Sequence, residues 1–195
     1  ENLNKFPIDW NIYSLDESCP LNESQLNVYL DIKANDKTDV YLIPLIMNIS
    51  GRYKIDAIIC ALESMLNVHP ILGMSVSDKE DVPYLVKGSK PLFDVVSEEV
   101  DDEFIVEFLS NPFDLSESLC RFLIVENSED YSLFAVFHHI IFDGLSKAIF
   151  KQDLQHILEG IVVDLDDSFL KVSAFNQQIT ESSDYAEAEE FYESM

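Results

Sequence analysis

The sequence predicts an α/β (α+β) two-layer sandwich, in which helices pack on a mixed or antiparallel sheet. Segments with helical spacing of apolar residues are interspersed with segments rich in β-branched residues. Two β-rich segments, 121–126 and 131–137, are separated by the turn-like residues 127–130, which predicts an antiparallel hairpin. The chain has 195 residues, 47% of them hydrophobic, so it can bury a core and fits one domain better than two.

The first helix is expected directly after an irregular lead-in. Residues 1–18 are assigned to the lead-in and 19–195 to the folded unit. Asn22 is a favourable N-cap, and Gln25 follows it by three residues, as in a capping box. The helix should therefore begin near Asn22 and run to about Ala34.

A strand and a second helix are expected next. Val40–Ser50 is rich in β-branched and aliphatic residues and ends at Gly51, which predicts a buried strand. Residues 54–67 carry apolar side chains at helical spacing, so they should form an amphipathic helix whose apolar stripe faces the core. This helix is expected to close at His69-Pro70.

The remaining elements are predicted from the helical spacing of apolar residues and from runs rich in β-branched residues. Strand 131–137 is apolar on both faces, which predicts a central, covered strand. The further elements expected are a hairpin of strands Leu72–Ser77 and Tyr84–Lys87, a helix over Asp102–Ser110 that stops near Pro112, a helix over Gly144–Leu158 that ends at Gly160, and an acidic helix over Asp184–Glu193.

The charge of the chain excludes several classes of partner. The formal net charge is −25, and affinity for nucleic acids rests on Lys and Arg that neutralise phosphates, so DNA, RNA and anionic membranes are not expected partners. Acidic residues cluster in 97–103 and 164–167, which indicates a solvated surface. No apolar run approaches the roughly 18 residues of a membrane span.

The cysteines and the N-terminus point to a reducing compartment. Cys19, Cys60 and Cys120 are odd in number and widely spaced, so neither a disulfide framework nor a CxxC site is expected, and the thiols should be reduced. The chain starts without Met and without the pattern of a secretory signal. We therefore expect a segment of a longer, cytoplasmic protein.

Two adjacent histidines carry most of the functional inference. His138 and His139 end a β-rich segment and precede Asp143-Gly144, where a helical segment begins. Side chains alternate across a strand, so the two imidazoles should face opposite sides. One of them can act as a base near neutral pH, while the other is held by packing or by a hydrogen bond. Gly144 would let the chain bend into the helix without a Cβ clash.

Several chemistries remain open at this point. Asp143 could orient a histidine, cap the helix or pair with an arginine, and both histidines could be structural only. Zinc is disfavoured, because no HExxH spacing is present and further ligands would have to come from distant segments. A serine hydrolase is disfavoured because no GxSxG is present. A histidine base without a protein nucleophile fits acyl transfer to an amine or hydroxyl supplied by the substrate.

The segment from His138 to Ser146 resembles the HHxxxDG motif of nonribosomal peptide synthetase condensation domains. Three other segments are similar to motifs of that family, in the same order along the chain. They are Pro20-Leu21-Asn22-Glu23-Ser24-Gln25 for "PLSxxQ", His69-Pro70-Ile71-Leu72 for "HxxLR", and Asn111-Pro112-Phe113-Asp114-Leu115 for the "PFDL" segment that precedes Arg121. The resemblance covers about residues 19–158, with a weaker match over 184–192.

The resemblance implies a fold and a set of roles. The fold is that of chloramphenicol acetyltransferase, two similar lobes around a channel, and 19–195 would be the N-terminal lobe. His139 would face the channel and help the acceptor amine attack a thioester, as a base or by positioning. His138 and Asp143 would be architectural, and the backbone near Gly144 would lie beside the reacting groups.

The resemblance also implies partners. Donor and acceptor would be carried on the phosphopantetheine of peptidyl or acyl carrier proteins, so no cofactor is expected on the domain itself. The other expected partners are the C-terminal lobe and an adenylation domain. A transferase that uses coenzyme A and acylates an alcohol or amine stays open, as does a degenerate, noncatalytic interaction module.

One position departs from the family pattern. The Arg that usually ends "HxxLR", and that pairs with the motif aspartate, is replaced here by Gly73. Loss of one partner of a buried pair is costly, so Asp143 needs another donor. We expect either an ion pair between Asp143 and Arg121 or an Asp143 that is satisfied by solvent.

Overall fold

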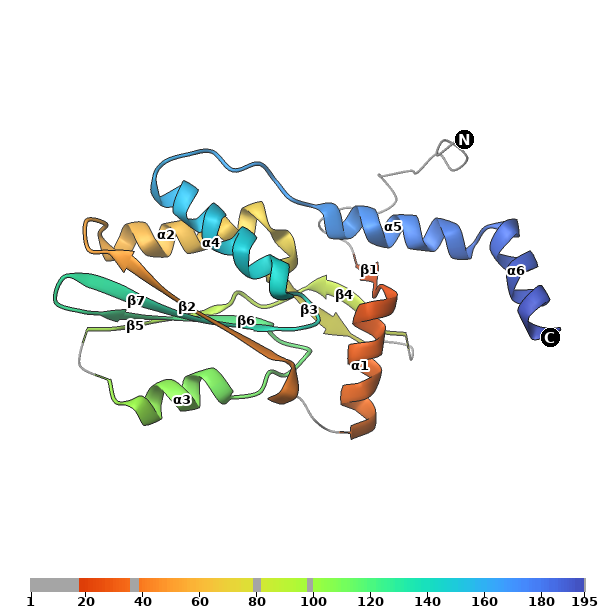
Figure 1. Cartoon of the computed structure of the whole chain (residues 1–195), viewed down its shortest axis with the longest axis horizontal. Coiled ribbons are helices and arrows are strands. Elements are labelled where there is room, and N and C mark those ends of the chain that lie inside the picture. The colour runs from red at the N-terminus through yellow and green to blue at the C-terminus, as the bar shows by residue number, and fades with distance from the viewer. Residues whose placement is uncertain (1–17, 36–38, 79–81, 98–99, 195) are drawn as a thin grey trace.

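The computed structural model describes residues 18–35, 39–78, 82–97 and 100–194. Nearly all of the lead-in assigned to 1–18 lies outside these residues. Within them, the chain forms two sheets with helices packed around them (Figure 1). No helix of the described part is long and apolar enough to cross a membrane.

The larger sheet is mixed. Its four strands lie in the order β2, β7, β6, β5; β7 pairs antiparallel with both neighbours, and β5 pairs parallel with β6. The smaller sheet is antiparallel, in the order β1, β4, β3. The strands are β1 (Cys19–Pro20), β2 (Leu42–Ser50), β3 (Met74–Ser77), β4 (Tyr84–Lys87), β5 (Leu92–Val96), β6 (Cys120–Glu126) and β7 (Asp130–His138).

The helices cover both faces of the larger sheet. α2 and α4 pack against each other on one face, and α3 lies on the opposite face (Figure 1). The helices are α1 (Glu23–Asn35), α2 (Ile55–Val68), α3 (Asp102–Ser110), α4 (Gly144–Leu158), α5 (Ser168–Thr180) and α6 (Ser183–Glu193), with short 3₁₀ helices η1 (Asp39–Tyr41) and η2 (Pro70–Gly73). α5 contacts β1, whereas α6 extends away from the body of the molecule (Figure 1).

The core lies between the larger sheet and the α2–α4 layer. Aromatic rings dominate it: Phe137 of β7 stacks on Phe142 with ring centroids 3.8 Å apart, and Phe122 of β6 stacks on Phe150 of α4 at 6.1 Å. All four side chains are buried. Burial of each such side chain contributes about 2–3 kcal/mol, so this cluster anchors the start of α4 against the end of β7.

Most of the predicted elements are confirmed. The mixed sheet with packed helices, the β6–β7 and β3–β4 hairpin pairings, the central place of β7 and the helices at Asp102–Ser110 and Gly144–Leu158 are as expected. The capping box of α1 is formed, since Asn22 N–H donates to Gln25 Oε1 and Gln25 N–H donates to Asn22 Oδ1, each at 3.0 Å.

Two predictions of local structure were wrong. β2 is an edge strand rather than a buried one, and only Leu45 and Ile49 of its residues are buried. A run of aliphatic residues shows that a strand forms but not how many neighbours it has. Leu72 lies in η2, so β3 begins at Met74. The proline at position 70 favours a helical turn at that point.

Candidate functional site

The loop between β7 and α4 holds both histidines. Its backbone is fixed to two neighbouring segments, because His138 N–H donates to Leu119 O and His139 N–H donates to Tyr41 O, each at 2.8 Å. Ile141 N–H donates to His138 O and closes a turn. The strand therefore ends at a defined residue, and the loop leaves it in a fixed direction.

His138 is a buried, neutral side chain. Its exposed fraction is 0%, its ring lies near those of Tyr41 and Phe113, and burial lowers its pKa to about 4, with a smaller contribution from His139. Nδ1 accepts a hydrogen bond from Ile140 N–H at 3.1 Å, so the ring proton resides on Nε2. Nε2 is buried and has no hydrogen-bond partner within the described residues. His138 thus acts as an acceptor that shapes the loop.

His139 is exposed, in contrast to its neighbour. Its ring meets the ring of Tyr41 edge to face at 6.4 Å. The structure therefore separates the two imidazoles into a buried one and an accessible one, as strand alternation predicts. Only His139 of this pair can approach a bound molecule.

The peptide groups around Ile140 are held from both sides. Ile140 N–H bonds to His138, and Ile140 O accepts a hydrogen bond of 2.9 Å from Gln25 Nε2 of α1. Gln25 therefore has two roles, because its Oε1 also completes the cap of α1. The sequence revealed the capping role only. The contact with the loop spans 115 positions, and no local pattern encodes it.

Asp143 is the N-cap of α4. Its Oδ1 accepts hydrogen bonds from Ser146 N–H at 2.8 Å and from Ser146 Oγ at 2.7 Å, and Ser146 Oγ also lies 3.2 Å from Asp143 N. The backbone bond from Ser146 is the main cause of the lowered pKa of Asp143, followed by the bond from the Ser146 hydroxyl. Of the three roles left open for Asp143, the structure shows the cap. The carboxylate is also exposed to solvent.

Gly144 does not play the conformational role expected of it. It is the first residue of α4 and has no positive φ, and a Cβ placed on it would meet nothing within 4 Å. The bend into α4 therefore needs no glycine. What Gly144 provides is open space beside the loop that carries His139.

The predicted ion pair between Asp143 and Arg121 is not formed, so that prediction was wrong. The Arg121 guanidinium donates to Phe108 O and Asn111 O at the end of α3, with a bond of 2.8 Å to the former, and lies over the ring of Phe113 at 4.4 Å. Arg121 precedes Phe122, whose ring faces α4, so strand alternation directs Arg121 to the α3 face. The sequence could not reveal this, since it does not show which face α3 covers.

Burial lowers the pKa of Arg121 to about 10. Its charge is compensated by carbonyl dipoles at the C-terminus of α3, where a cation is favourable. Arg121 is therefore a structural residue of the lobe. Asp143 finds its donors on Ser146 and in solvent, which is the second of the two expected arrangements.

His69 joins α4 to the end of α2 and the segment before α5. Its Nε2 lies 2.9 Å from Asp153 Oδ2 of α4, and its Nδ1 lies 3.6 Å from Asp166 Oδ2 of the segment before α5. This segment is also held by a hydrogen bond of 2.7 Å from Asp166 N–H to Val68 O. His69 is thus placed as a connector between the end of α2, α4 and the entry to α5. No group of His, Cys, Asp and Glu within the described part of the chain could hold a metal ion.

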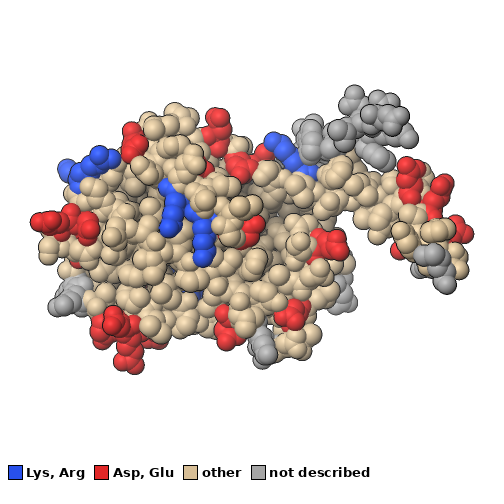
Figure 2. Space-filling view, viewed as in Figure 1, with Lys and Arg blue, Asp and Glu red and all other residues tan. Residues whose placement is uncertain are grey.

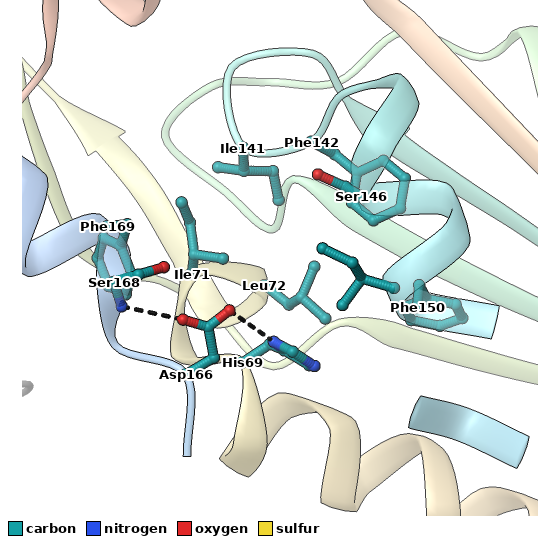
Figure 3. A pocket seen from close by; sticks show the side chains of 11 residues that line it. His69, Ile71, Leu72, Ile141, Phe142, Ser146, Phe150, Asp166, Ser168 and Phe169 are labelled. Carbon is teal, nitrogen blue, oxygen red and sulfur yellow. Dashed lines mark hydrogen bonds and ion pairs between the residues drawn. The ribbon is translucent and has the colours of Figure 1, made fainter. Parts of the chain in front are cut away.

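A cavity of about 220 Å³ opens next to the histidine loop (Figure 3). Its walls come from η2, the loop, the first two turns of α4 and the start of α5. It is lined by His69, Ile71, Leu72, Ile141, Phe142, Ser146, Ile149, Phe150, Asp166, Ser168 and Phe169.

The charge is unevenly placed on the face seen in Figure 2. Acidic side chains lie around its periphery, and basic side chains near its centre lie over α4, which contains Lys147 and Lys151.

The chain is similar to a known protein family and to parts of much longer synthases. The family described as "Condensation domain" matches residues 16–195. Surfactin synthase subunit 2 of Bacillus subtilis (strain 168) is 28% identical over 184 residues, which are 92% of this chain and 5% of that protein. Gramicidin S synthase 2 of Aneurinibacillus migulanus is 30% identical over 146 residues, which are 72% of this chain and 3% of that protein.

A solved structure shares the fold. The starter condensation domain of rhizomide synthetase RzmA superposes with a TM-score of 0.73 at 16% identity, over 91% of this chain and 49% of that one. The chain thus spans about half the length of that domain and a small part of each synthetase.

Proposed function

The chain belongs to the condensation-domain family, and from that premise we propose that residues 19–195 are the N-terminal lobe of a condensation domain that forms amide bonds. Donor and acceptor would be acyl or aminoacyl thioesters on the phosphopantetheine of carrier proteins, and the domain itself would hold no cofactor. The observation that carries this proposal is the division between the histidines. His139 is exposed on a loop in which both the N–H and the C=O of Ile140 are hydrogen-bonded, while His138 is buried and neutral.

The proposed reaction is aminolysis of a thioester. The acceptor amine attacks the donor carbonyl, a C–N bond forms, and the C–S bond breaks. His139 would accept the proton of the attacking amine or hold the amine in place, and the proton ends on the departing thiol. The open space at Gly144 supports a path for the reacting groups beside His139.

The remaining partners are proposals as well. A C-terminal lobe would complete the channel, and an adenylation domain would supply activated amino acids. Helix α6 extends from the body of the molecule (Figure 1). Its side chains Tyr185, Phe191 and Tyr192 are exposed, which supports a partner surface that covers them. We further propose that the protein acts in the cytoplasm, where its three free thiols stay reduced.

The test uses the full-length protein with separately loaded carrier proteins. Mass spectrometry of the acceptor carrier should show the donor acyl group joined to the acceptor amine. The same reaction with coenzyme A thioesters in place of the donor carrier distinguishes the alternative transferase, which would use them as well or better. No transfer from either donor would support the noncatalytic interaction module and overturn the proposed activity.

A further inference from the structure

The cavity beside α4 has an apolar interior. Most of its wall consists of aliphatic and aromatic side chains, namely Ile71, Leu72, Ile141, Phe142, Ile149, Phe150 and Phe169. No Lys or Arg is among its lining residues. An anionic group entering this space would lose hydration without gaining an opposite charge, which is costly.

The side chains of His69, Asp166 and Ser146 at the cavity already have partners within the protein. Asp166 accepts a hydrogen bond of 3.1 Å from Ser168 N–H and lies beside His69, as the dashed lines of Figure 3 show. His69 is also bonded to Asp153, and Ser146 Oγ donates to Asp143. These groups need no ligand to satisfy them. The cavity therefore fits a neutral, apolar group.

The volume of the cavity limits the size of the group that it can bind. An engineered apolar cavity of roughly 150 Å³ holds benzene, whereas sites for drug-sized ligands occupy about 300–1,000 Å³. A volume of about 220 Å³ lies between these values. It matches a branched aliphatic or aromatic side chain and is too small for a whole substrate.

The cavity is continuous with the loop that carries His139. Ile141 and Phe142, which line it, follow His139 by two and three residues. Two residues of chain span at most about 7 Å, so the wall of the cavity begins within that reach of the His139 backbone. A carbonyl reacting beside His139 can direct the substituent of its α-carbon into this space.

We propose that this cavity binds the apolar side chain of an aminoacyl thioester and selects leucine- or phenylalanine-sized side chains over small or acidic ones. The inference rests on the proposed amide-forming function and adds its substrate class. Ile149 is the most suitable position for a test, because it lines the cavity, lies on α4 and is 49% exposed. A larger side chain there can fill the cavity from its rim without disturbing the buried core.

The experiment compares Ile149→Trp with Val106→Trp in the full-length protein. Val106 is 61% exposed on α3, on the opposite face of the sheet, so it is a matched control. The ratio of kcat/KM for leucyl over alanyl thioesters should fall about tenfold or more in Ile149→Trp and stay unchanged in Val106→Trp. An unchanged ratio in Ile149→Trp would overturn the inference.

A binding measurement separates this inference from the proposed reaction. Saturation-transfer NMR on the full-length protein should detect N-acetyl-leucine methyl ester and detect the alanine ester far more weakly, with the leucine signal lost in Ile149→Trp. Equal signals for both esters, or a leucine signal that persists in Ile149→Trp, would contradict the cavity assignment. Binding of the leucine ester by a protein that forms no amide would leave the cavity assigned and the reaction refuted.

Discussion

Gln25 Nε2 donates a hydrogen bond of 2.9 Å to the carbonyl oxygen of Ile140, so the first turn of α1 is tied to the histidine loop. The same side chain accepts from Asn22 N–H with its other amide atom. One glutamine thus couples the start of a helix to the loop that presents His139. The N-terminal motif and the histidine motif are therefore in direct contact in the fold.

Gln25→Glu should separate these two roles. The carboxylate still accepts from Asn22 N–H, but it has no proton to donate to Ile140 O at neutral pH, so that carbonyl loses its partner. We expect kcat for amide formation to fall about tenfold while KM changes little. Steady-state kinetics of the full-length protein measures this change. Asn22→Ala is the control: it should cost about 1 kcal/mol of stability and leave kcat unchanged.

Gly144→Ala should separate stability from activity. The new Cβ meets no atom within 4 Å, and alanine favours a helix over glycine, so the free energy of unfolding should rise by about 0.5 kcal/mol. Activity of the full-length protein should fall if substrates pass over this residue. Gly51→Ala is the contrasting variant, because its Cβ would lie 2.1 Å from Glu129 O, and it should lose about 2 kcal/mol or more. Equal effects of the two substitutions on stability would contradict the difference in space around the two glycines.

Because His138 is buried and neutral, the free energy of unfolding should depend on pH. Its folded pKa of about 4 lies below the unfolded value of 6.5, so the unfolded state binds more protons between these values. Stability from neutral His138 is complete above pH 6.5 and declines as the pH falls towards 4, by about 3 kcal/mol. Urea unfolding at several pH values between 4 and 7 gives the free energy of unfolding of the wild type and of His138→Asn, which keeps an acceptor near Nδ1. The difference between the two curves measures the contribution of His138. Parallel stability curves for the two proteins would contradict a buried, neutral His138.

Arg121 and Asp143 should not be coupled. Arg121→Met removes the donor to Phe108 O and Asn111 O and should cost about 3 kcal/mol, whereas Asp143→Asn keeps a good N-cap and should cost less than about 0.5 kcal/mol. In a double-mutant cycle, the two effects should add within about 0.5 kcal/mol. A coupling energy above about 1 kcal/mol would indicate that Arg121 and Asp143 interact, contrary to the structure.

Local patterns predicted much of this fold because they depend on neighbouring residues. The capping box of α1, the span of α3 and the β6–β7 hairpin are set by residues within a few positions of one another. β5 was missed because it pairs in parallel with β6, which no turn signals. α5 (Ser168–Thr180) was also missed. The β5–β6 pairing is a contact made only in the folded chain.

In the candidate site, too, the features set by neighbouring residues were predicted and the long-range contacts were not. The contrast between His138 and His139 was predicted correctly from side-chain alternation, although His139 lies one residue beyond the end of β7. The partner of Arg121 and the second bond of Gln25 were not accessible, because both depend on which segments meet across the sheet. The cavity likewise needs η2, α4 and α5 together, which lie far apart in the sequence.

The central claim is that His139 serves the reaction while His138 shapes the loop. The most direct measurement is the single-turnover rate of amide formation by full-length His139→Ala, with both carrier proteins loaded in advance. The account predicts a rate at least about 100-fold below that of the wild type, with unchanged loading and unchanged stability. A rate within about threefold of the wild type would contradict a role for His139 in the reaction.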